Sequence, residues 1–219
     1  MTPALDRARL SAMIDEMARL QEAHNLEVAA DWRERGLEDD RAIWVECAEL
    51  LDHFGWKWWK KQTPDAAQVE LELVDIWHFG LSLLLRDGGL DESLVAAFEA
   101  GLPAGRGKGG DDPETFRRDV ERLAATALTD KRFDVDAFLA CLAWLGVDAA
   151  SLYASYVGKN VLNNFRQHNG YKDGSYRKTW AGREDNEHLV ELVATLDPAD
   201  DDFAEGLADA LARRYAETA

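Results

Sequence analysis

The sequence is poor in cysteine and in long apolar runs, and each shortage excludes a class of protein. Its 219 residues include two cysteines, Cys47 and Cys141, in unrelated settings. This argues against a disulfide framework or a zinc site and fits a reducing compartment, so we expect a cytoplasmic protein. No segment reaches the roughly 18 consecutive apolar residues that a membrane span needs, and the first residues lack the apolar core of a secretory signal, so neither is expected.

Positive charge is also scarce, and what there is lies unevenly. Lysine and arginine number 25 against 42 aspartates and glutamates, giving a net charge of -17, which argues against direct nucleic-acid binding. The window from Lys159 to Arg183 is the exception, because it holds six basic residues and one acid, Asp173, for a net charge of +5. A basic island in an acidic protein indicates a local anion site, with a solvated basic loop as the alternative.

The spacing of apolar residues predicts helices almost throughout, and nothing reads as a series of strands. The expected fold class is therefore all-α. A glycine-rich stretch at residues 101–113 and the turn-rich residues 167–179 are predicted to be loops. The expected helices cover approximately residues 5–30, 40–61, 65–85, 114–126, 135–145, 149–166, 185–196 and 202–216.

Two pairs of acids at helical spacing are the most informative feature. Glu46 and Glu49 form one pair, and Glu72 and Asp75 form the other. Residues three apart lie on one face of a helix, and both helices are apolar on most other sides, so these carboxylates are expected to be buried rather than to line a solvated face. Four carboxylates brought together need protonation or a cation, and oxygen ligands suit Mg²⁺ or Mn²⁺.

Aromatic and basic residues near these acids could complete a nucleotide site. Tryptophans and phenylalanines flank the acidic stripes and could form core, a dimer interface or a stacking platform for a base. Lys159, Asn163 and Arg166 share one helical stripe, and the following loop offers further donors, so together they could cradle a triphosphate. The loop donors are Lys172, Tyr176 and Lys178.

At these residues the chain resembles the dimeric dUTPases of the all-α, MazG-like NTP pyrophosphatase superfamily. The resemblance covers roughly residues 13–85 and 151–193, and the ExxE and ExxD pairs alone mark only the superfamily. The aromatic block and the loop that follows residue 169 are more specific to the dUTPase branch. The matching strings are ECAELLD from Glu46, WKWWK from Trp56, ELVDIWHF from Glu72, GKNVLNNFRQ from Gly158 and GYKDGSY from Gly170.

The resemblance implies roles for individual residues. Glu46, Glu49, Glu72 and Asp75 would bind Mg²⁺, for which Mn²⁺ could substitute. Because Val45 stands where some superfamily members have a further glutamate, a metal-bound water, aided by Glu49, would have to serve as nucleophile. The residues expected around uracil and deoxyribose are Gln21, Asn25, Trp59, His78 and Phe79. Those expected at the phosphates are Lys159, Asn163, Arg166, Lys172, Tyr176 and Lys178, of which Lys159 and Arg166 would also be catalytic.

The resemblance also implies an activity and an architecture. The expected reaction is the hydrolysis of dUTP and dUDP to dUMP, which limits the incorporation of uracil into DNA. The expected enzyme is a homodimer. We expect a single all-α domain over residues 1–219, with the active site between helices. Residues 1–86 and 149–196 would form its catalytic core, and residues 87–148 a variable helical insert that contains the glycine-rich loop.

Three alternatives remain open at this point. A related pyrophosphatase could act on dCTP or on non-standard nucleotides. A di-iron carboxylate protein is suggested by Asp75-x-x-His78, although that class needs two such motifs. A non-enzymatic helical interaction protein would leave the acids solvated and use its aromatic residues to bind a partner.

Overall fold

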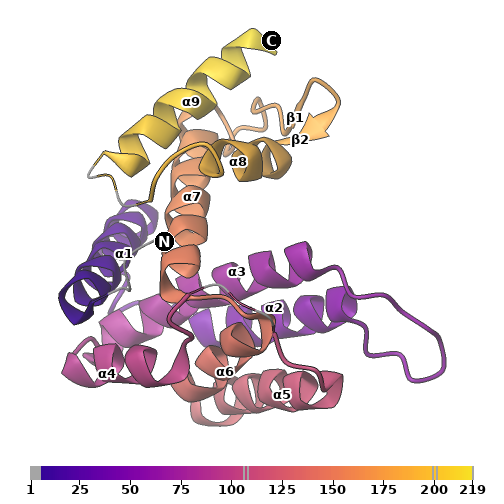
Figure 1. Ribbon diagram of the computed structural model, residues 1–219. Helices are drawn as coiled ribbons and strands as arrows, with labels where there is room; N and C mark the ends of the chain where they lie inside the picture. The colour runs from indigo at the N-terminus through magenta and orange to yellow at the C-terminus, as the bar shows by residue number, and fades with distance from the viewer. Residues whose placement is uncertain (1–5, 106, 108, 199, 201, 219) are drawn as a thin grey trace. The chain divides into compact units, whose positions relative to one another are not determined.

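Helices dominate the structure, as the apolar spacing predicts (Figure 1). The computed structural model describes residues 6–105, 107, 109–198, 200 and 202–218. The all-α fold class is confirmed in this part of the chain, where the strands are two residues long and form one antiparallel pair. The elements are α1 (Arg7–Val28), α2 (Asp39–Phe54), α3 (Ala66–Asp87), α4 (Glu92–Gly101), α5 (Pro113–Asp130), α6 (Val135–Leu145), α7 (Ala149–His168), β1 (Thr179–Trp180), β2 (Arg183–Glu184), α8 (Asp185–Val193) and α9 (Phe203–Glu217).

The chain forms two compact units, and each is described by itself. The first unit extends to Leu152 and the second begins at Tyr153, close to the start of α7. The predicted catalytic core draws on both units, so the arrangement of residues 1–86 and 149–196 as one domain stays a prediction.

The first unit is built around α2 and α3, which pack along each other, with α5 against α2. Apolar residues at helical spacing, such as Leu50 of α2 and Leu73 of α3, are fully buried in this contact. The segment predicted as an insert contributes to the same core. The Phe116 ring lies 4.4 Å from that of Phe54, and the ring of Phe138 stacks on Trp77 at 5.1 Å.

The second unit packs the later part of α7 against α8 and α9. Gly158 permits close approach there, because a Cβ at this position would lie 3.0 Å from a methyl group of Val193. Trp180 of β1 is fully buried beside the rings of Phe165 and Tyr215. The turn between β1 and β2 thus fixes the end of the basic island, residues 159–183, which is called the basic segment below, against a small aromatic core.

The helices differ from the expectation chiefly at α1, α2 and α4, while α5 ends four residues later and α8 three residues earlier than expected. Helix α2 ends at Phe54 rather than near residue 61, because Gly55 adopts a φ of 95°, a conformation that side chains disfavour. Helix α4 was not predicted, although Asp91 caps it by accepting a hydrogen bond from the Ser93 amide. Helix α1 begins at Arg7; the predicted start at residue 5, like residues 106 and 108 of the glycine-rich loop, lies outside the described residues.

Among the described residues, no single helix is long and apolar enough to cross a membrane, although the bent pair α6 and α7 meets the criteria of length and composition.

Candidate active site

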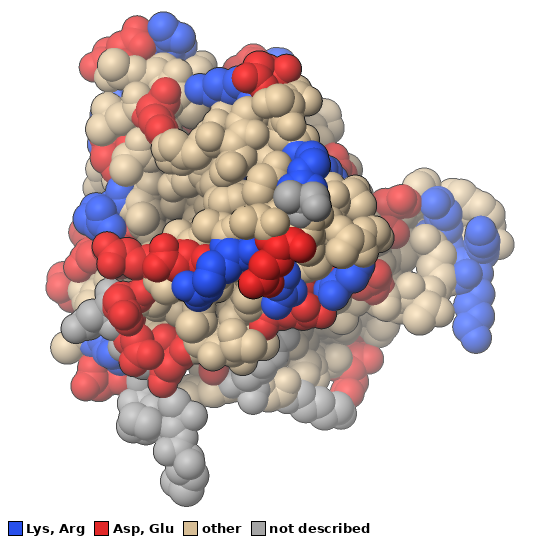
Figure 2. Space-filling view, turned by 90° about the horizontal axis from the view of Figure 1, so that it is seen from above, with Lys and Arg blue, Asp and Glu red and all other residues tan. Residues whose placement is uncertain are grey.

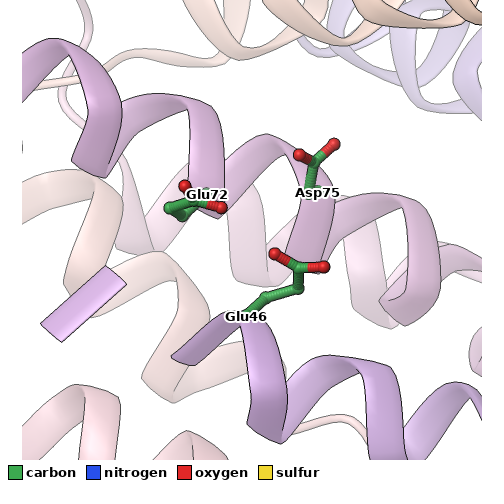
Figure 3. Close-up of side chains that lie close together, drawn as sticks. All are labelled: Glu46, Glu72 and Asp75. Carbon is green, nitrogen blue, oxygen red and sulfur yellow. The ribbon is translucent and has the colours of Figure 1, made fainter. Parts of the chain in front are cut away.

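Three acids from α2 and α3 come together in the first unit (Figure 3). Carboxylate oxygens of Glu46, Glu72 and Asp75 all lie within 4.8 Å of one another. Glu72 and Asp75 are neighbours because residues three apart share a helix face, and packing of α2 on α3 brings Glu46 to them. Of the four acids that the sequence predicts to meet, the structure brings these three together.

Crowding changes the acidity of this cluster. Burial, followed by the charge of Asp75 and a hydrogen bond with Glu72, raises the pKa of Glu46 to about 8. Glu72 is 9% exposed, and burial also raises the pKa of its carboxyl, although hydrogen bonding with Glu46 opposes the shift. The imidazole Nε2 of His53 lies 3.4 Å from a carboxylate oxygen of Glu72. Without a cation, the cluster therefore holds a proton that an ordinary surface glutamate would lose.

The donor set fits a hard divalent cation. Two oxygens bound to one Mg²⁺ at about 2.1 Å can be at most about 4.2 Å apart, so small side-chain movements would bring the three carboxylates onto one ion. A cation would also replace the proton that Glu46 retains, which is the usual resolution for like charges in a partly buried site.

Glu49, the fourth predicted ligand, occupies a more exposed position on α2. Its charge nevertheless contributes to the raised pKa values of both Glu46 and Glu72, so it lies within electrostatic reach of the cluster. Its role as a ligand stays a prediction.

A buried polar cluster joins α1 to α3 in the same unit. The side-chain NH₂ of Gln21 donates to the Asn25 carbonyl oxygen at 3.0 Å and to the hydroxyl of Ser82 at 3.1 Å. The Asn25 amide donates to the same hydroxyl at 2.9 Å, and Nδ1 of His78 lies 2.9 Å from the Gln21 carbonyl oxygen. Three residues predicted to surround the nucleoside are thus brought together, with Ser82 as an unexpected fourth member.

The other two predicted base-binding residues lie elsewhere on this unit. Trp59 is 56% exposed, in the loop between α2 and α3, where its ring packs edge-on against Trp56 and Trp58. Phe79 is half-buried on α3, directly after His78. Their roles at the base stay predictions.

In the second unit, a buried carboxylate organises the basic segment. Nε and Nη2 of Arg166 donate to the two oxygens of Asp185, both at 2.8 Å, and the Tyr176 hydroxyl donates to the same carboxylate at 2.8 Å. Asp185 is 0% exposed, and its burial disfavours ionisation. The hydrogen bonds from Arg166 and Tyr176 outweigh that effect, so the pKa of Asp185 lies below its usual value.

The remaining predicted phosphate ligands differ in their surroundings. Asn163 accepts a hydrogen bond from Nη1 of Arg166 at 3.2 Å, and Lys159 is buried on α7. Lys178 pairs with Glu184 at 3.2 Å on the surface, and Lys172 is exposed. Since these residues belong to the second unit and the carboxylates to the first, the predicted enclosure of a polyphosphate between them stays a prediction.

Ser82 and Asp185 are the polar residues that the sequence reasoning missed. Ser82 follows His78 by four residues, so helical spacing could have placed it beside the base-binding set. Asp185 begins α8, where an acid is ordinary because it favours the helix dipole, so its sequence context carries no signal of a buried partner for Arg166.

One comparison bears on the identity of this site. Residues 10–171 match the sequence model of a protein family described as dUTPase. No curated protein matches the chain. The matched stretch includes all four predicted metal ligands and the stripe on α7, and it runs through the middle segment; Lys172, Tyr176, Lys178 and Asp185 lie beyond it.

Proposed function

The chain belongs to the dUTPase family, and on that premise we propose that it hydrolyses dUTP to dUMP and pyrophosphate with Mg²⁺ held by Glu46, Glu72 and Asp75. Membership makes the protein a dUTP diphosphatase, a hydrolase of nucleotide metabolism with the all-α fold of this family. The metal, the roles of individual residues and the range of substrates are the proposed parts.

The cluster of three carboxylates is the observation that carries the proposal. When bound, Mg²⁺ would lower the pKa of a water molecule, orient it and neutralise charge on the phosphates. Mn²⁺ would fit the same oxygen donors. In this proposal Glu46, Glu72 and Asp75 would hold the ion, and Glu49, exposed on the same helix as Glu46, would accept a proton from an attacking water.

The nucleoside would bind against the polar cluster of α1 and α3. Gln21, Asn25 and His78 offer amide and imidazole groups whose orientations are fixed by their mutual hydrogen bonds. Such a rigid set can accept the polar edge of uracil and the deoxyribose hydroxyl while rejecting analogues that leave a buried group unpaired. Phe79 and Trp59 would supply ring faces.

The phosphates would bind to the basic segment of the second unit. Arg166 presents a guanidinium whose plane is fixed by Asp185, and Tyr176 is fixed by the same carboxylate. Lys159, Asn163, Lys172 and Lys178 would complete this surface. The Tyr176 hydroxyl gives its hydrogen to Asp185, whereas Nη1 of Arg166 keeps a hydrogen for a phosphate. Because Asp185 holds the guanidinium in position before substrate arrives, the entropic cost of binding is lowered.

We further propose that dUDP is a substrate, that the enzyme is a homodimer and that it works in the cytoplasm. The two free cysteines, both buried, are compatible with a reducing compartment. A related specificity for dCTP or non-standard nucleotides is the alternative within the same chemistry. The di-iron reading has less support, because His78 contacts Gln21 in the polar cluster instead of joining the three carboxylates.

A substrate panel tests the proposal. The purified protein is incubated with dUTP, dUDP, dCTP, dTTP or UTP, with Mg²⁺, with Mn²⁺ or with a chelator, and the nucleoside monophosphate released is measured. Asp75→Asn removes a cluster ligand, and Glu70→Gln is its matched control because Glu70 lies on the same helix outside the cluster.

We expect dUMP from dUTP and dUDP, dependence on the divalent cation, and loss of turnover in Asp75→Asn alone. Preference for dCTP would overturn the base assignment, and full activity in Asp75→Asn would overturn the metal site. Light scattering of the eluted protein tests the homodimer separately, and a mass of one chain would overturn it.

A further inference from the structure

The loop between α2 and α3 connects the two helices that carry the acidic cluster. It holds Trp56, Trp58 and Trp59, and Trp58 is 90% exposed, although tryptophan is normally shielded from water. The loop projects to the right in Figure 1 and in Figure 2, where blue lysine atoms lie along it. Because its tip is exposed, the direction of this loop depends on how its base is held.

The base of the loop begins at Gly55, where α2 ends. The Gly55 amide donates to the Leu51 carbonyl at 2.9 Å, and Gly55 has a φ of 95°. The side-chain oxygen of Gln62 accepts from the Lys57 amide at 2.7 Å, which ties the two arms of the loop together. A Cβ at Gly55 would lie 2.9 Å from Cβ of Gln62, so the glycine is needed for both its conformation and its lack of a side chain.

Arg117 of α5 holds this point from outside the loop. Its Nε and Nη2 both donate to the Gly55 carbonyl, at 3.0 and 2.7 Å, and its guanidinium lies over the Phe54 ring at 5.3 Å. Nη1 bonds to Glu114 at 3.1 Å, which fixes the guanidinium on its own helix. A cation at the carboxyl end of α2 also complements the helix dipole.

These contacts connect the predicted insert, residues 87–148, to the loop between α2 and α3. We propose that Arg117 is a positioning residue, which sets the exit direction of the loop from α2 and thereby the place of Trp59 over the nucleobase. This assignment rests on the proposed function, because it takes Trp59 to contact the base. Arg117 itself touches no reacting group and acts through the Gly55 carbonyl and the loop that follows it.

The decisive experiment is a double-mutant cycle of Arg117→Met with Trp59→Ala, measured as KM and kcat for dUTP. Methionine keeps apolar contact with Phe54 and removes every donor, while Arg117→Lys restores one cationic donor. Arg118→Met is the matched control, since Arg118 is the next residue of α5 and bonds to Thr115 on an exposed face.

We expect Arg117→Met to raise KM roughly tenfold and to change kcat by less than about threefold, because a displaced loop weakens base binding more than it disturbs the carboxylates. Arg117→Lys should recover part of this loss, and Arg118→Met should match the wild type. In the Trp59→Ala background, Arg117→Met should change KM by less than about twofold. Equal effects of Arg117→Met in both backgrounds, or no effect in either, would overturn the proposal.

A second measurement does not depend on turnover. Quenching of tryptophan fluorescence by acrylamide, without nucleotide, reports the exposed loop rings, and Arg117→Met should change the accessible fraction while Arg118→Met should not. If the wild type fails to hydrolyse dUTP, the proposed function fails, and this arm still decides whether Arg117 positions the loop. Identical quenching in the wild type and Arg117→Met would overturn that role.

Discussion

The acidic cluster of the first unit and the basic segment of the second handle charge in opposite ways. Glu46, Glu72 and Asp75 gather like charges, and the pKa of Glu46 rises to about 8, chiefly because of burial. Arg166 instead meets Asp185 in a two-point ion pair, and the pKa of Asp185 falls. In the proposed function, the unbalanced charge of the cluster would take up a cation, whereas the ion pair would hold Arg166 in position for a phosphate.

The largest expected effect comes from removing charge at the unbalanced site. Glu72→Gln should lower kcat for dUTP with Mg²⁺ by about 10²–10³-fold, since loss of one electrostatic contributor at a reacting centre typically costs this much. Steady-state release of dUMP checks it, with far-ultraviolet circular dichroism to show that the variant is folded. A kcat within threefold of the wild type would contradict the assignment of Glu72 as a ligand.

Breaking the ion pair of Arg166 and Asp185 should chiefly lower the stability of the protein. Asp185→Asn leaves the guanidinium of Arg166 buried without its counter-charge, so at pH 7 we expect the free energy of unfolding to fall by about 3–5 kcal/mol. Urea titrations followed by far-ultraviolet circular dichroism check this value.

The pH dependence of that loss has a definite sign. Because the folded-state pKa of Asp185 is lowered, its contribution is present above the unfolded-state pKa of about 3.9 and disappears as pH falls through the folded-state value. The wild type and Asp185→Asn should therefore converge below that pKa. A constant gap down to acid pH would show that the loss comes from packing. Arg166→Met with Asp185→Leu is the control, since replacing both partners should cost less than the single change.

The stability of the acidic cluster should depend on the divalent cation. In chelator at pH 9, above the pKa of Glu46 of about 8, Glu46→Gln should raise the melting temperature by a few degrees, because it removes one charge from a crowded cluster. With Mg²⁺ the order should reverse, since the wild type gains stability by binding the ion and the variant loses a ligand. Thermal unfolding of both proteins in the two buffers tests this; a Mg²⁺ response of equal size in both would count against Glu46.

The smallest expected effect on stability comes from Lys178, an exposed residue of the basic segment. Lys178 and Glu184 form an exposed pair, each side chain more than half accessible, so Lys178→Ala should change the free energy of unfolding by less than about 0.5 kcal/mol. The KM for dUTP should nevertheless rise if Lys178 contacts phosphate. Urea titration and steady-state kinetics on one preparation separate the two, and a large loss of stability would show that the pair is not a surface feature.

The local pattern of apolar residues predicted most of the helices. It failed where a single residue or a capping contact sets the helix boundary. The apolar spacing of α3 and α6 placed both helices within about two residues. The end of α2 was predicted too late because Gly55, a residue type common at helix ends, directly precedes WKWWKK and was not weighed. The contact of Arg117 with the Gly55 carbonyl, 62 residues away in sequence, is one that no local pattern indicates. Helix α4 was left unassigned although Asp91 and Glu92 are typical of a helix start.

The candidate site shows the same division. Helical spacing placed Glu72 beside Asp75, and the resemblance indicated Gln21, Asn25 and His78, which the structure joins by hydrogen bonds. Ser82 was missed because a serine in an apolar helix has many neutral roles. The predicted binding of phosphate by the second unit stays a prediction, because it depends on where loop residues such as Lys172 lie when a nucleotide is bound.

The all-α class, the paired carboxylates and the basic island could be read from the sequence alone, because they depend on composition and on spacing within one continuous stretch of chain. Only tertiary structure decided that Glu46 meets the acids of α3, that Arg166 is neutralised by Asp185 and that Arg117 reaches Gly55. Each of these contacts joins different elements, and its energy depends on burial and distance, which no local pattern encodes.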